Sequence, residues 1–120
     1  MKQILVVMSV LSMLLGSNDS ADDKVSLLSP LEFRSHVEGK EVQLVDVRTP
    51  REFDQGHIEG AINIDYYSGK FSLEFNKLMK DKAVYVYCRS GKRSRNSANK
   101  LAAMGFTKIY DLQGGIINYN

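Results

Sequence analysis

Residues 83–101 read Ala-Val-Tyr-Val-Tyr-Cys-Arg-Ser-Gly-Lys-Arg-Ser-Arg-Asn-Ser-Ala-Asn-Lys-Leu. The first five residues form an apolar run of the kind found in buried strands, and the run from residue 94 onward has helical spacing. Short apolar strands that alternate with helices are typical of parallel sheets that are covered on both faces. We therefore expect an α/β domain of three layers, with about five short strands in a mostly parallel central sheet.

The same alternation extends to both sides of this stretch. Ser29 with Glu32, and Thr49 with Glu52, have the spacing of capping boxes, and each has a proline at the first helical position. Gly105 is placed to close a helix in a Schellman motif. We expect strands at residues 42–47, 61–64, 83–87 and 108–112, and helices at residues 30–38, 50–55, 72–79, 94–104 and 116–120.

The N-terminal residues have the pattern of an export signal. Lys2 is followed by an apolar run over residues 4–15 and then by small polar residues. This run is too short for a comfortable membrane span but fits the apolar centre of a signal peptide, although retention as an anchor is the alternative. We expect a signal peptide at residues 1–21, export to a Gram-negative periplasm, a short linker at residues 22–28 and one domain at residues 29–120.

Composition limits the possible functions. The net charge of +2 is too small to suggest a nucleic-acid partner. One cysteine and two distant histidines, His36 and His57, cannot build a structural zinc site, and we expect no cofactor. The sequence gives no indication of the oligomeric state.

The single cysteine, Cys88, stands where the strand-like run meets the helix-like run. Backbone N–H groups at a helix start carry partial positive charge, and Arg89, Lys92 and Arg93 add cationic side chains. Such a setting favours the thiolate, which is the nucleophilic form of cysteine. A buried structural cysteine is the simpler alternative, but the adjoining Gly91 and cations favour a reactive thiol that acts on an anionic substrate.

Three segments resemble the rhodanese family of sulfurtransferases over residues 28–119. They are Val45-Asp46-Val47-Arg48-Thr49-Pro50-Arg51-Glu52-Phe53 with Gly56-His57-Ile58-Glu59-Gly60-Ala61, the loop Cys88-Arg89-Ser90-Gly91-Lys92-Arg93, and Gly105-Phe106 with Leu112-Gln113-Gly114-Gly115-Ile116. The resemblance implies a rhodanese-like fold and transfer of a sulfane sulfur, from thiosulfate or a related anionic donor, to cyanide or a thiol through a Cys88 persulfide.

The resemblance also implies roles for residues of the loop. Its backbone N–H groups, including those of Ser90 and Gly91, are expected to surround the persulfide sulfur. Arg89, Lys92 and Arg93 are candidates to hold the donor. Outside the loop we expect three supporting residues, with Asp46 and Arg48 forming an ion pair and His57 bracing a loop rather than acting as a base.

Two alternatives remain open. A non-catalytic binding or sulfur-relay module would keep the fold without turnover. A cysteine phosphatase or arsenate reductase would share the anion-binding helix start. Four residues separate Cys88 from Arg93, whereas the phosphatase pattern has five, and the shorter loop favours a single sulfur atom over a tetrahedral anion.

Overall fold

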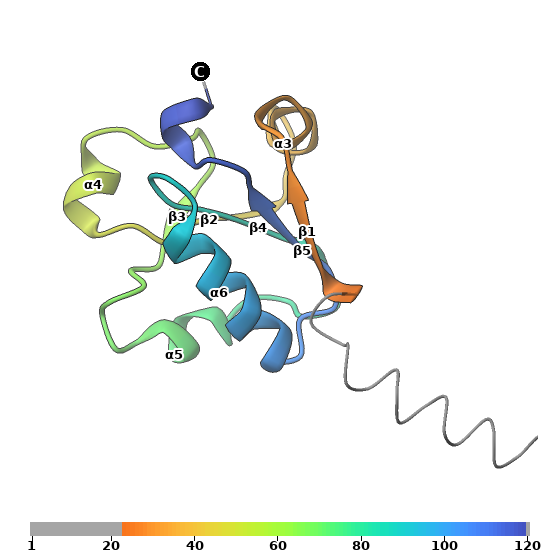
Figure 1. The fold of residues 1–120 in the computed structure, drawn as a ribbon. Helices are drawn as coiled ribbons and strands as arrows, with labels where there is room; N and C mark the ends of the chain where they lie inside the picture. The colour runs from red at the N-terminus through yellow and green to blue at the C-terminus, as the bar shows by residue number, and fades with distance from the viewer. Residues whose placement is uncertain (1–22, 120) are drawn as a thin grey trace, which may run out of the picture.

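A parallel sheet of five strands forms the middle layer of the structure, a computed structural model that describes residues 23–119 (Figure 1). The strands lie in the order β1-β5-β4-β2-β3, and every pairing is parallel. This arrangement confirms the expected fold class. The strands are β1 (Val25–Leu28), β2 (Gln43–Asp46), β3 (Ile62–Asn63), β4 (Val84–Tyr87) and β5 (Ile109–Leu112).

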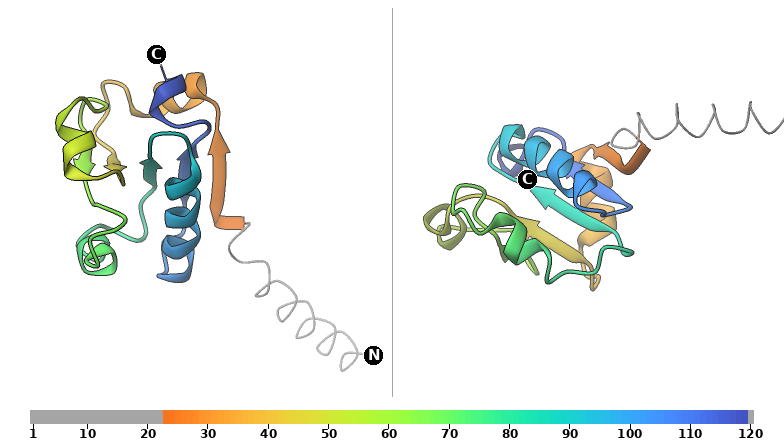
Figure 2. Two further views of the ribbon diagram at one scale, coloured as in Figure 1. Left: turned by 60° about the vertical axis from the view of Figure 1, so that its left-hand side comes forward. Right: turned by 90° about the horizontal axis from the view of Figure 1, so that it is seen from below.

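Helices cover both faces of the sheet (Figures 1 and 2). Val84 and Val86 of β4 pack in one apolar cluster with α5 and α6, whereas Tyr85 and Tyr87 pack in a second cluster with α3. The alternation follows from the two-residue period of a strand, and it buries β4 completely. The helices are α3 (Pro30–Val37), α4 (Pro50–Asp54), α5 (Phe71–Phe75), α6 (Lys92–Ala103) and the single 3-10 turn η1 (Ile116–Asn118).

The two expected capping boxes are both present. The Ser29 hydroxyl accepts the Glu32 N–H while the Glu32 carboxylate accepts the Ser29 N–H, and Thr49 and Glu52 make the same exchange at the start of α4. Each box satisfies backbone donors that a helix start leaves without a partner. The entry points of α3 and α4 are therefore fixed by local sequence.

Both ends of α6 are set by glycines. Gly91, with φ of 112°, stands at the cap, so the helix begins at Lys92, two residues before the expected start. At the other end Gly105 donates to the Ala102 carbonyl and Phe106 donates to the Leu101 carbonyl. These are the two hydrogen bonds of the expected Schellman motif.

The expected linker at residues 22–28 is wrong, because residues 25–28 form β1. This strand pairs with β5 at four positions. Only Leu28 of the four residues is buried, so the strand has no apolar alternation to reveal it, and its stability comes from pairing with β5. The expected signal peptide, residues 1–21, lies outside the described residues.

The expected helix at residues 72–79 is shorter, since α5 ends at Phe75. The chain then tightens into turns in which Leu78 donates to the Phe75 carbonyl. The Gln43 side chain on β2 accepts the Met79 N–H at 2.7 Å and donates to the Met79 carbonyl at 2.9 Å. This contact with a distant strand replaces the helical hydrogen bonds that the local sequence favours.

None of the helices within residues 23–119 is long and apolar enough to cross a membrane.

Because β1 belongs to the sheet, its one buried side chain should contribute to stability. Leu28 is 9% exposed whereas Leu27 is 59% exposed. We expect Leu28→Ala to lower the free energy of unfolding by about 2 kcal/mol, and Leu27→Ala, the matched control, to change it by less than about 0.5 kcal/mol. Urea denaturation measures both. Equal effects of the two variants would contradict the assignment of residues 25–28 to the domain core.

Candidate active site

The carboxyl ends of neighbouring strands bring the predicted site residues to one edge of the sheet. Cys88 follows β4 directly, and Arg48 follows β2 after one intervening residue. The two strand ends are joined by a hydrogen bond from the Val47 N–H to the Tyr87 carbonyl at 3.0 Å. In a parallel sheet this edge is where ligand sites form, and the two loops do meet there as the sequence predicts.

The Cys88 thiol is enclosed by its own loop. The side chain is only 1% exposed, and the Gly91 N–H donates to Sγ at 3.1 Å. The positive φ of Gly91 is a conformation that only glycine adopts readily. This residue therefore both directs an amide at the sulfur and starts α6, so that the helix N-terminus faces the same atom.

The segment after β5 supports the loop from behind. The Ile116 N–H donates to the Cys88 carbonyl at 2.9 Å, and the Ile117 N–H donates to the Arg89 carbonyl at 3.3 Å. Gly115 lies so close that a Cβ added there would be 2.1 Å from the Arg89 carbonyl oxygen. Gly115 is thus required by the close approach of two backbones, whereas a Cβ at Gly114 would meet the side chain of Asn118.

Arg93 is engaged by a carboxylate. Its guanidinium donates to both oxygens of Glu52, at 2.7 and 3.0 Å, and these hydrogen bonds lower the pKa of Glu52 to about 2. Sequence reasoning gave Glu52 only its capping role and missed this pair, which fastens α4 to the start of α6. Arg89 and Lys92 are exposed, as is Ser90.

Asp46 and Arg48 form the expected ion pair, and both are buried. The Arg48 Nη2 atom lies 2.6 Å from one Asp46 oxygen. The same nitrogen donates to the Gly56 carbonyl at 2.7 Å. The pair therefore joins the end of β2 to the loop that follows α4, which confirms the ion pair; that the pair braces the active-site loop stays a prediction.

His57 is exposed and contacts α4. Its ring stacks on Phe53 with centroids 3.7 Å apart, and Nδ1 lies 2.9 Å from the Phe53 carbonyl oxygen. Within residues 23–119 no hydrogen bond joins His57 to Cys88. This placement agrees with a bracing role and gives no support to a general base at this position.

Two further residues were missed by sequence reasoning. Ser94 Oγ lies 3.6 Å from Cys88 Sγ and donates to the Asp111 carboxylate at 2.6 Å. Asp111 is 3% exposed, and its burial raises its pKa to about 6 against the effect of the Ser94 hydrogen bond. The signal that could have identified Asp111 is its position near the end of its strand, because it pairs with Val86 near the carboxyl end of β4.

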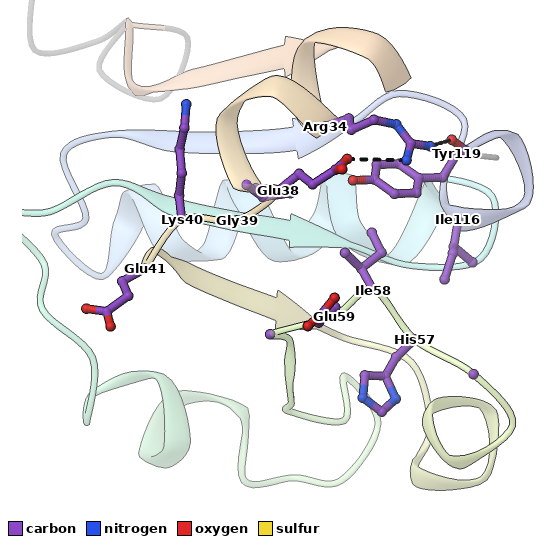
Figure 3. A pocket seen from close by; sticks show the side chains of 13 residues that line it. Arg34, Glu38, Gly39, Lys40, Glu41, His57, Ile58, Glu59, Ile116 and Tyr119 are labelled. Atoms are coloured by element: carbon purple, nitrogen blue, oxygen red, sulfur yellow. Dashed lines mark hydrogen bonds and ion pairs between the residues drawn. The ribbon is translucent and has the colours of Figure 1, made fainter.

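Two clefts open near the site, and Cys88 lines neither. The larger one, of about 730 Å³, lies between the end of α3 and the 56–60 loop and includes His57, Ile116 and Tyr119 (Figure 3). The smaller one, of about 420 Å³, is lined by residues of β1, α6 and the end of β5, including Asp111. In residues 23–119 no three potential ligand side chains gather closely enough to hold a metal ion.

The Glu52–Arg93 pair should stabilise the fold in a pH-dependent way. A carboxyl whose pKa falls from 4.5 to about 2 on folding stabilises the native state above pH 4.5, and this contribution disappears as the pH falls toward 2. Because Glu52 is 26% exposed, we expect Glu52→Gln to lower the unfolding free energy at pH 7 by only about 1 kcal/mol.

Glutamine keeps the capping box, so this variant isolates the charge. Urea denaturation at neutral and at acidic pH provides the measurement, with the exposed Glu59→Gln as control. A loss of stability at low pH as large as the loss at pH 7 would contradict the assignment.

Gly115 provides a second prediction. We expect Gly115→Ala to displace the Cys88 loop and to lower the unfolding free energy by about 2 kcal/mol or more. Gly69→Ala is the matched control, because Gly69 has a similar positive φ but no atom within 4 Å of an added Cβ. Thermal unfolding should separate the two variants. If both lose the same stability, backbone strain alone accounts for the effect and the close packing against Arg89 contributes nothing.

The chain is similar to known proteins in both structure and sequence. Among solved structures, the crystal structure of a rhodanese-like domain protein from Staphylococcus aureus superposes with a TM-score of 0.70 at 28% identity, covering 79% of this chain and 91% of that one. A Bacillus subtilis protein, uncharacterized protein YqhL, is 42% identical over 88 residues, which are 73% of this chain and 67% of that protein.

A tRNA uridine(34) hydroxylase from the Aster yellows witches'-broom phytoplasma is 33% identical over 105 residues. The match covers 84% of this chain but only 34% of the hydroxylase, so the chain corresponds to about a third of that protein. The family model for the rhodanese-like domain matches residues 29–120. The sheet order and the Cys88 loop agree with this match. The chain therefore belongs to the rhodanese-like domain family.

Proposed function

We propose that this protein is a sulfurtransferase that carries a sulfane sulfur on Cys88. The Cys88 thiolate forms a bond to the outer sulfur of a donor such as thiosulfate, and the sulfur–sulfur bond of the donor breaks. Sulfite leaves with that electron pair, and one negative charge remains on the Cys88 persulfide. An acceptor, cyanide in an assay or a thiolate in the cell, then bonds to the outer sulfur, and Cys88 leaves as the thiolate.

The observation that carries this proposal is the hydrogen bond from Gly91 to Cys88 Sγ. An amide that is already directed at the sulfur stabilises negative charge without reorganisation during the reaction. The N-terminus of α6, a helix of 12 residues, adds partial positive charge at the same place. Both features favour the anionic sulfur at the start of the reaction and again when Cys88 is the leaving group.

The surroundings of the thiol favour a small anionic donor. Arg89 and Lys92 are exposed beside it, so they are free to attract an anion, whereas Arg93 is held by Glu52. A sulfur atom with so little exposed surface is suited to a slim donor that approaches end-on. The hydroxylase relative shares only this domain, so we base the proposal on the Cys88 loop and not on that relative's name.

The direct test is the mass of Cys88 after exposure to thiosulfate. We expect the Cys88 peptide to gain about 32 Da, the mass of one sulfur atom, and to lose it on addition of cyanide as thiocyanate forms. Cys88→Ser should abolish both the adduct and thiocyanate formation. Peptide mass spectrometry and a thiocyanate assay provide the readouts.

Two results would overturn this function. Persulfide that accumulates on Cys88 without turnover, for cyanide and for thiols alike, would mark a sulfur-relay module. Hydrolysis of p-nitrophenyl phosphate without thiocyanate formation would instead mark a phosphatase.

A further inference from the structure

The proposed reaction makes no use of the buried carboxyl of Asp111. This side chain lies on β5 with 3% of its surface exposed. Among residues 23–119, its hydrogen-bond partner is Ser94, whose hydroxyl donates to Oδ1 at 2.6 Å. A buried carboxyl with so few partners is costly to ionise, and it stands only two contacts away from the reactive sulfur.

Ser94 connects the two groups. Its Oγ atom lies 3.6 Å from Cys88 Sγ, 2.6 Å from Asp111 Oδ1 and 3.2 Å from the Gly91 carbonyl oxygen. A hydroxyl has one hydrogen to donate, so Ser94 cannot donate to the sulfur and to the carboxylate at the same time. Of the two acceptors within reach of the Ser94 hydroxyl, the Asp111 carboxylate at 2.6 Å is closer than the Gly91 carbonyl at 3.2 Å, so Ser94 donates to Asp111, and the thiol of Cys88 donates to Ser94.

We propose that Asp111 is a positioning residue that sets the direction in which Ser94 donates, so that the Ser94 hydroxyl supports negative charge on Cys88 only while Asp111 carries a proton. This inference deepens the proposed function, since it concerns charge on the same sulfur. When Asp111 takes up one proton from solvent, its O–H donates to Ser94 Oγ. The Ser94 hydrogen is then released to donate to the thiolate. Cys88, whose S–H donates to Ser94 Oγ while Asp111 is ionised, gives its own proton to solvent as it becomes the thiolate that accepts from Ser94.

The charges around Asp111 make this protonation accessible. The residues that pair with Asp111 on the two neighbouring strands are uncharged: Leu27 of β1 and Val86 of β4. From α6 the exposed Arg95 favours the carboxylate, but this effect is smaller than that of burial, and the pKa of Asp111 rises to about 6. On the sulfur side, Arg93 is the charged group that interacts with Cys88.

The smaller cleft gives this proton its own route to solvent. Asp111 lines that cleft together with Arg95, Asn99 and Gln113, whereas Cys88 does not. A proton can therefore reach Asp111 from the side of β1 and α6 without passing the sulfur. Ser90 and Gly91 of the Cys88 loop border the same cleft, so proton exchange at Asp111 takes place next to that loop.

The test measures the rate at which iodoacetamide alkylates Cys88 in the full chain and compares the wild type with Asp111→Asn. The rate is read from the mass of the Cys88 peptide. Asparagine at position 111 donates an N–H to Ser94 as the protonated acid does. We expect Asp111→Asn to react up to about tenfold faster than the wild type at neutral pH. The ratio of the two rates should approach one as the pH falls below the Asp111 titration and the wild-type acid becomes protonated.

A second variant separates the hydroxyl from simple charge repulsion. Adding Ser94→Ala to Asp111→Asn should remove most of the gain, because the hydroxyl that donates to the sulfur is gone. Ser97→Ala is the matched control, since Ser97 is also buried on α6 but donates to the Arg93 carbonyl. It should react as the wild type does.

Either of two results would overturn the inference. One is an Asp111→Asn rate no higher than the wild-type rate at neutral pH. The other is a gain that persists in full when Ser94 is replaced by alanine. If Asp111→Asn does not fold, Ser94→Ala alone serves, because alkylation below the Asp111 titration must then be slower than in the wild type. Alkylation needs no sulfur donor. If the wild type forms no thiocyanate, that result therefore contradicts the proposed function and leaves the inference about Asp111 untouched.

Discussion

The hydrogen bond from the Gly91 amide to the Cys88 sulfur is the contact on which the rest of the site depends. It requires a positive φ at residue 91, and the same backbone conformation starts α6 at the next residue. The fold and the chemistry are therefore linked at one glycine. A change that moved this amide would alter both the helix start and the charge that the sulfur can carry.

The loop has little freedom because three separate parts of the chain hold it. Glu52 fastens it to α4 through Arg93, Ile116 holds the Cys88 carbonyl from behind, and Ser94 joins the sulfur to β5. Each contact uses a group on a different element. Such pre-organisation suits the loop to the charged sulfur of the proposed reaction.

Sequence predicted the features that depend on neighbouring residues. These features are the capping boxes, the Schellman motif, the strand–loop–helix at Cys88 and the Asp46–Arg48 pair. In each of them, the residues that interact lie within a few positions of one another in the chain. Sequence failed where partners are far apart in the chain. β1 is stable only through β5, Gln43 ends the turn at Met79 from 36 positions away, and Glu52 meets Arg93 from 41 positions away.

The most direct test of the account is the amide signal of Gly91 in a two-dimensional NMR spectrum of the nitrogen-labelled protein. Loading of Cys88 with sulfur from thiosulfate should shift the Gly91 amide proton more than the amides of α3, which packs on the opposite face of the sheet, and Cys88→Ser should abolish the shift. A Cys88 that becomes persulfidated while the Gly91 signal stays in place would contradict the claim that this amide supports the charged sulfur.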